Sequence, residues 1–223
     1  MAPLALAACG GSSSKPASNS TLRAAARTTL ARGSERVALH GSLDLAGQKV
    51  SVEGDGAFSR RAGTLRLHLD LPGFGKATVD ELVVGTGRWI SSPLLASSLH
   101  GKKWLRLTGT KVLGLDLGAF AGVTPTTALR VLQLNGKVTS LGTDTLSGIS
   151  TMHYHLDLDV VRDGAHLQSA DAWVDGDQLV RRVKLELAAP TGNGKAQTAV
   201  TIDYSDFGVH VDVAPPPPAQ VSA

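Results

Sequence analysis

Apolar and polar residues alternate along most of this chain, which is the pattern of β-strands that bury one face and expose the other. The alternation is clearest at residues 64–71, where four leucines occupy every second position and polar residues stand between them. Residues 150–161 alternate in the same way and place Tyr154, Leu156, Leu158 and Val160 on one face. Both segments therefore predict strands of an antiparallel sheet.

The same period of two recurs in nine further segments, most of them separated by turn-forming residues such as Pro72-Gly73 and Asp163-Gly164. These candidate strands are residues 37–45, 50–58, 77–85, 88–91, 103–107, 138–145, 169–174, 179–187 and 197–205. The chain is thus expected to contain about ten or eleven strands, joined in order.

Two segments have helical spacing instead. In residues 20–33, Leu22, Ala25 and Leu30 follow the i, i+3, i+8 pattern, Asn19 or Ser20 can cap the start, and Gly33 is a natural end. In residues 125–134, apolar residues recur at helical spacing after Thr124-Pro125, which is an N-cap followed by proline at the first helical position. We expect one helix before the strands and one between them.

A long meander must curl, and its apolar face must be covered. The predicted fold class is therefore α+β, with a curved antiparallel sheet, an incomplete barrel, wrapped around one or two helices. The 25 glycines agree with this, because glycine permits a strand to bend.

A curled sheet of this kind would enclose an aliphatic hollow that suits a flexible hydrocarbon ligand. Its predicted lipid-binding residues come from the strands and the second helix: Val50, Val52, Leu65, Leu67, Leu69, Leu129, Leu132, Tyr154, Leu156, Leu158, Val183 and Leu185. The alternative is that the same side chains fill a dry core, and the pattern alone does not separate the two.

The only cysteine of the 223 residues, Cys9, has no partner for an intramolecular disulfide. It follows the apolar run Leu6-Ala7-Ala8, and this sequence resembles the lipobox of bacterial lipoproteins, in which the cysteine sulfur is acylated after the leader is removed. Only eight uncharged residues precede Cys9, which indicates a leader that begins upstream. The resemblance implies anchoring to the outer face of the cell membrane by the lipid on Cys9.

The organisation predicted from these features has four parts. Residues 1–8 are a truncated leader, residues 9–19 a lipidated flexible tether, residues 20–214 a single half-barrel domain, and residues 215–223 a loose Pro-rich tail. No run reaches the 18 or more apolar residues of a spanning helix, so the lipid would be the anchor.

Composition removes several function classes. The net charge is only +3 and the basic residues are dispersed, which argues against a nucleic-acid partner. Aromatic residues make up 4%, too few for base-stacking surfaces. The absence of any cysteine besides Cys9 means that the fold does not depend on disulfides.

Three further segments resemble LolA-like and LppX/LprG-like actinobacterial envelope lipoproteins. Residues 148–158 are similar to their G-x-x-T-x-H-Y strand, residues 172–183 to their W-V-D-x-x-x-L-V-R-R hairpin, and residues 204–216 to their closing D-F/Y-G motif with its two prolines. With the lipobox, the resemblance spans nearly the whole chain. It implies a half-barrel lipoprotein that carries or presents a lipid in the cell envelope. A structural or interaction lipoprotein with a filled core remains the alternative.

Candidate chemistry is sparse. His153, His155, Asp157 and Asp159 share one strand face, where two histidines at i and i+2 could reach one metal ion, but the exposed face of a strand carries polar residues in any case. There is no G-x-S-x-G elbow, and Asp206-Phe207-Gly208 lacks the other kinase motifs. We expect no enzymatic activity, no cofactor and no resident metal.

Overall fold

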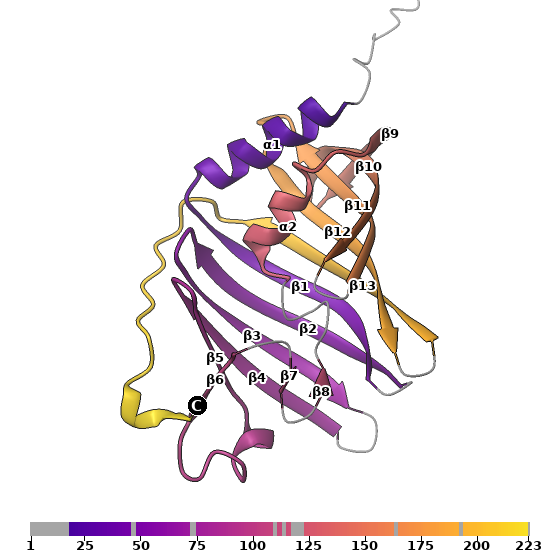
Figure 1. The fold of residues 1–223 in the computed structure, drawn as a ribbon. Coiled ribbons are helices and arrows are strands. Elements are labelled where there is room, and N and C mark those ends of the chain that lie inside the picture. The colour runs from indigo at the N-terminus through magenta and orange to yellow at the C-terminus, as the bar shows by residue number, and fades with distance from the viewer. Residues whose placement is uncertain are drawn as a thin grey trace, which may run out of the picture.

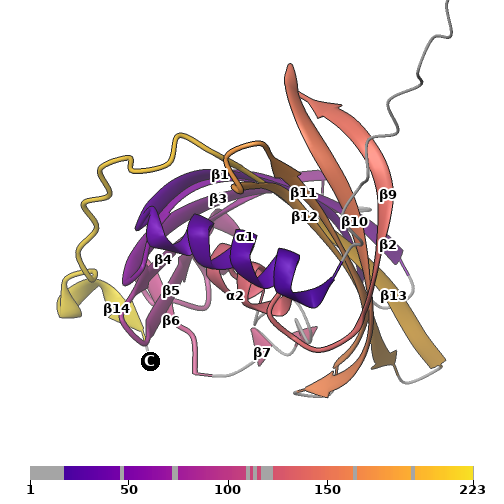
Figure 2. The ribbon, with the colours of Figure 1, turned by 90° about the horizontal axis from the view of Figure 1, so that it is seen from above.

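The computed structural model describes residues 18–45, 48–71, 75–108, 111–112, 115–116, 123–162, 165–191 and 194–222. Two helices lie on one side of a large, strongly curved sheet (Figures 1 and 2). Twelve strands form that sheet and two very short strands form a separate pair. The predicted α+β fold with an incomplete barrel is confirmed.

The sheet consists of two meanders joined edge to edge. The first meander runs through β1 (Ser34–Leu45), β2 (Gln48–Ser59), β3 (Ala62–Leu71), β4 (Gly75–Val84), β5 (Gly87–Ser91) and β6 (Trp104–Arg106). The second runs through β9 (Lys137–Leu146), β10 (Ile149–Arg162), β11 (Ala165–Asp175), β12 (Val180–Thr191) and β13 (Gly194–Ser205). The small pair is β7 (Lys111–Val112) with β8 (Leu115–Asp116).

Pairing of β1 with β13 joins the two meanders, and all neighbours within and between them are antiparallel. The order of strands is β14-β6-β5-β4-β3-β2-β1-β13-β12-β11-β10-β9, so the edges do not pair with each other and the barrel stays open. We call its concave side, which carries the helices, the inner face.

The C-terminal tail is not loose, contrary to expectation. Its last residues form β14 (Val221–Ser222), which pairs in parallel with β6 and is the one strand beyond the predicted ten or eleven in the main sheet. Lys103 N–H also donates to the carbonyl of Gln220 at 3.0 Å. The tail thereby covers an edge strand whose backbone groups would otherwise lack partners.

Both helices form where the sequence predicts them. Helix α1 (Asn19–Ala31) ends just before Gly33, whose φ of +87° suits a residue without Cβ. Helix α2 (Pro125–Val131) begins at Thr124, whose hydroxyl accepts from Thr127 N–H in a capping box. The predicted N-cap of α1 is off by one position, because Ser18 occupies it.

Two glycines on β2 explain how the sheet curls so tightly beside β3. A Cβ on Gly56 would lie 2.1 Å from the carbonyl oxygen of Thr64, and a Cβ on Gly54 would lie 2.7 Å from a methyl group of Leu67. The backbone of β3 and the side chain of Leu67 therefore occupy the space that side chains at these two positions would need. Only glycine permits this approach, which is the role that the sequence predicted for its glycines.

Candidate functional site

Apolar side chains cover the inner face in rows that run across the strands. One row aligns Leu69, Val52, Gly41, Val200, Leu185, Ala170 and Leu156. The next aligns Leu67, Gly54, Leu39, Ile202, Val183, Ala172 and Tyr154. The register thus brings together residues of the first and second meanders that are more than a hundred positions apart in the sequence.

The twelve predicted lipid-binding residues fall into two groups by burial. Eight are buried: Val50, Val52, Leu65, Leu129, Leu132, Leu156, Val183 and Leu185. Four are only half-buried although they pack against the same core: Leu67, Leu69, Tyr154 and Leu158. The buried residues already contact protein, whereas the half-buried ones retain surface that a ligand could cover. Whether any of them contacts a lipid stays a prediction.

The half-buried group lies on the two strands that flank the covered centre of the sheet. Along β3, Leu65 is 6% exposed, whereas Leu67 and Leu69 are half-buried. Along β10, Leu156 is fully buried, whereas Tyr154 on one side of it and Leu158 and Val160 on the other are half-buried. Burial therefore falls from Leu65 to Leu69 on β3, and on both sides of Leu156 on β10.

Few polar contacts fasten the helices to the sheet. The hydroxyl of Thr29 on α1 accepts from Val180 N–H of β12 at 2.8 Å and donates to the carbonyl of Ala25 at 2.9 Å. The phenol of Tyr204 on β13 donates to the carbonyl of Pro125 at 2.8 Å. The rest of the helix–sheet contact is aliphatic, made by residues such as Leu22 and Leu129.

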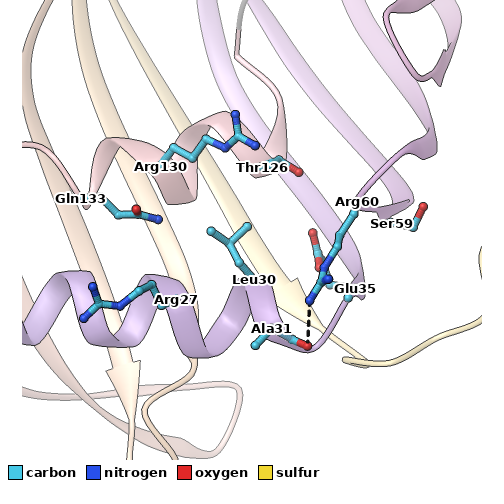
Figure 3. Close-up of a pocket in the computed structure, with 10 residues that line it drawn as sticks. Arg27, Leu30, Ala31, Glu35, Ser59, Arg60, Thr126, Arg130 and Gln133 are labelled. Atoms are coloured by element: carbon cyan, nitrogen blue, oxygen red, sulfur yellow. Dashed lines mark hydrogen bonds between the residues drawn. The ribbon is translucent and has the colours of Figure 1, made fainter.

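A cleft of about 500 Å³ opens between the C-terminal part of α1, helix α2 and the adjoining ends of β1 and β2 (Figure 3). It is lined by Arg27, Leu30, Ala31, Gly33, Glu35, Ser59, Arg60, Thr126, Arg130 and Gln133. None of the twelve predicted residues, all of which the structure describes, lines this cleft. We call it the helix-end cleft.

The electrostatics of the helix-end cleft are dominated by arginine. Arg27 and Arg130 form no hydrogen bond or ion pair with a described residue, whereas Arg60 donates to the carbonyl of Ala31 at 3.5 Å. Glu35 is the single acidic residue of the lining, and only 5% of it is exposed. Burial raises the pKa of Glu35 to about 7, so it is only partly ionised at neutral pH.

Sequence reasoning missed the helix-end cleft, although the chain carries a sign of it. The segments 18–34, 59–64 and 123–137 hold six arginines and no acidic residue, while acidic residues are spread through the strands. Only the tertiary structure shows that these three segments meet.

The two histidines of β10 contact the same carboxylate oxygen of Asp171, whereas Asp159 does not join them. His153 and His155 each approach Asp171 of β11, at 3.2 and 2.9 Å, and His153 also stacks on Trp173 with ring centroids 4.0 Å apart. Asp159 instead contacts His166 at 2.7 Å. Within the described part of the chain, no cluster of three or more such side chains has a geometry that could hold a metal ion.

Cys9 lies outside the described residues, so its predicted lipidation is not placed by the structure. Among the described helices, neither has the length and apolar character needed to cross a bilayer.

Comparison with known proteins identifies the class of fold. LprF from Mycobacterium bovis superposes with a TM-score of 0.52 at 15% identity, over 91% of this chain and 99% of LprF. The lipoprotein LppX from Mycobacterium tuberculosis superposes with a TM-score of 0.50 at 15% identity, over 88% of this chain and all of LppX. A putative outer membrane lipoprotein-sorting domain from Vibrio parahaemolyticus aligns more distantly, with a TM-score of 0.36 at 10% identity.

The chain therefore has the fold of the LprF and LppX structures, over nearly its whole length and nearly the whole of theirs. The resemblance predicted from the sequence motifs is confirmed at the level of the fold. No protein-family model and no curated protein matches the sequence itself.

Proposed function

We propose that this protein is a cell-envelope lipoprotein that is anchored to the outer face of the membrane through acylated Cys9 and holds a lipid against the inner face of its half-barrel. It acts by binding and not by catalysis. The lipid's acyl chains replace water over the aliphatic side chains, and each buried methylene contributes about 0.8 kcal/mol.

The observation that carries the proposal is the incomplete burial of inner-face leucines on β3 and β10. Leu67, Leu69 and Leu158 face the apolar side of an open sheet but are not fully covered by protein. An open barrel with uncovered aliphatic surface on its inner face is suited to a ligand that is itself a flexible hydrocarbon. The fold shared with LprF and LppX, and the lipobox-like sequence at Cys9, support the same proposal.

The alternative is an interaction lipoprotein that binds a protein partner with its outer surface. It is favoured by the eight predicted residues that are already buried, since a lipid could reach them only if the helices moved. The two functions differ in whether the inner face accepts a molecule.

Native mass spectrometry decides between them. The full chain carrying C9S, which cannot be acylated at this residue, would be purified without detergent and the same sample extracted with organic solvent. A stoichiometric adduct that is recovered as a lipid supports the carrier. A clean apo mass that also takes up no added phospholipid or glycolipid refutes the carrier and favours the interaction protein.

A pair of tryptophan variants tests whether the lipid binds on the inner face of the sheet. L69W adds bulk on the inner face of β3, and H68W adds the same bulk on the exposed outer face one residue away. We expect L69W to lower lipid uptake severalfold, because the indole occupies the ligand's space, while H68W leaves uptake unchanged. Equal uptake by both variants would place the lipid elsewhere.

A further inference from the structure

The charges around the helix-end cleft are segregated by sign. Its walls come from α1, the β2–β3 turn and α2, and the six arginines of these segments are Arg23, Arg27, Arg32, Arg60, Arg61 and Arg130. The single acidic residue in the lining of the cleft is Glu35, which is buried. Unbalanced positive charge of this kind concentrates anions at the surface that carries it.

Backbone contacts hold these walls together. Arg60 N–H donates to the carbonyl of Gly33 at 3.2 Å, which fixes the β2–β3 turn against the end of α1. The guanidinium of Arg23 donates from Nε to the carbonyl of Gln133 at 3.0 Å, which joins α1 to the segment after α2. The cleft is thus formed by elements that are fixed to one another.

The groups in the cleft match a phosphate in charge and in hydrogen-bonding chemistry. Arginine presents a planar fork of N–H donors that fits phosphate oxygens, and Arg27 and Arg130 have no partner among the described residues. The neutral polar side chains of Gln133, Ser59 and Thr126 also line the cleft and can bond hydroxyl groups. A volume of about 500 Å³ falls in the range of small-molecule sites and exceeds what a single ion needs.

The cleft also adjoins the apolar interior. Leu30 lines the cleft and packs against the core beneath the helices. Helix α2 presents Thr126 and Arg130 to the cleft and buries Leu129 in that core. A molecule with an anionic head in the cleft would place the start of an apolar tail beside the half-buried Leu30, at the edge of that core.

We propose that the helix-end cleft binds the phosphate-bearing headgroup of an anionic lipid, with Arg27, Arg60 and Arg130 as its phosphate-binding residues. This inference rests on the proposed function, because it assigns the headgroup of the lipid whose chains that function places on the inner face. It adds a class of ligand: an anionic phospholipid in preference to a zwitterionic one.

The test uses the full C9S chain and two lipids with identical acyl chains, phosphatidylglycerol and phosphatidylcholine, with bound lipid quantified by native mass spectrometry. R27Q/R130Q removes two cleft cations. The matched control, R36Q/R66Q, removes the same charge from two exposed residues that pair with Asp206 and Asp80 away from the cleft. Binding of glycerol 3-phosphate by calorimetry is the arm without acyl chains.

We expect the parent and the control variant to prefer phosphatidylglycerol. In R27Q/R130Q that preference should fall severalfold, because the two lost cations attract the net negative headgroup of phosphatidylglycerol more strongly than the net neutral headgroup of phosphatidylcholine. Uptake of phosphatidylcholine should fall less, since it shares the phosphate but carries its own cation. Circular dichroism checks that both variants fold.

Three results would overturn the inference, and they differ in what they say of the proposed function. Equal uptake of both lipids by parent and variant removes the headgroup site but leaves the lipid carrier. An equal loss in R36Q/R66Q attributes the preference to general surface charge. Uptake of neither lipid refutes the carrier. Arginine-dependent binding of glycerol 3-phosphate would then identify the cleft as a site for a soluble phosphate ester.

Discussion

Inner-face leucines on the two flanking strands differ in how far the protein covers them. Leu65 of β3 and Leu156 of β10 are buried in the core with α1 and α2. Leu67 and Leu69 on β3, and Leu158 on β10, have the same chemistry and lie on the same face of the sheet but remain half-buried. Equivalent sequence patterns thus produce packed positions and incompletely covered positions on the same two strands.

This difference assigns separate roles to the two sets of positions. The buried positions stabilise the fold, because their side chains exchange water for close packing. The half-buried positions contribute less to stability and keep surface for a ligand. Substitutions of single residues test that division.

Two leucines on β10 compare a buried and a half-buried position directly. L156A removes a fully buried side chain and should destabilise the protein by about 2–5 kcal/mol through lost burial and a residual cavity. L158A on the same strand should cost about 1 kcal/mol or less, because water already reaches part of that side chain. Urea denaturation measures both. Similar losses would show that the half-buried position is as tightly packed as the buried one.

Glu35 lines the helix-end cleft and is buried. Burial raises its pKa to about 7 from 4.5, so the folded state keeps a proton that the unfolded chain has released. Stability should therefore fall as pH rises from about 4.5 to about 7 and then level off, by up to about 3 kcal/mol in total.

Replacement of Glu35 tests that dependence. E35Q should remove most of the decline and should be more stable than the parent above about pH 7. The control E53Q changes an exposed carboxyl on β2 and should leave the profile unchanged. Thermal denaturation across this pH range gives the profiles. A slope that persists in E35Q would assign it to another group.

The hydroxyl of Thr29 joins helix α1 to strand β12 by a hydrogen bond. T29V deletes the hydroxyl that bonds Val180 N–H and leaves that buried donor without its partner, which should cost about 1–3 kcal/mol. T29S keeps the hydroxyl and should cost less. Amide hydrogen exchange at Val180 gives a local readout. Unchanged protection of the Val180 amide in T29V would mean that apolar contacts alone hold helix α1 on the sheet.

We expect the smallest change in stability for His155, on the outer face of β10. Burial lowers the pKa of His155, but hydrogen bonds and charges from Asp171 and Asp157 outweigh it and raise that pKa above 6.5. The resulting stabilisation is present below the unfolded pKa and is lost as pH rises through the folded pKa.

H155Q should therefore cost under about 1 kcal/mol near pH 5.5 and nothing near pH 8, because the pair is partly exposed. H68Q, on the exposed face of β3, is the control. Urea denaturation at the two pH values measures the difference. A loss that is equal at both would show that shape, and not charge, is what His155 contributes.

Local patterns in the sequence predict most of the helices and strands. Alternation predicts the long strands such as β3 and β10, because a half-buried strand must change polarity at every residue. Local chemistry predicts the helices, since Thr124-Pro125 and Gly33 act within a single turn of chain. The curled, open sheet follows from the number of strands and the need to cover their apolar face.

The pairing of distant strands, the extent of burial along each strand and the helix-end cleft depend on the tertiary structure. That β1 meets β13, and that the tail pairs with β6, depends on contacts between residues far apart in the sequence, which no local pattern specifies. The burial of Leu156 against the half-burial of Leu158 depends on where the helices lie, and alternation gives both residues the same prediction. The helix-end cleft likewise exists only because the fold brings together three arginine-bearing segments, each of which by itself is an ordinary exposed turn or helix.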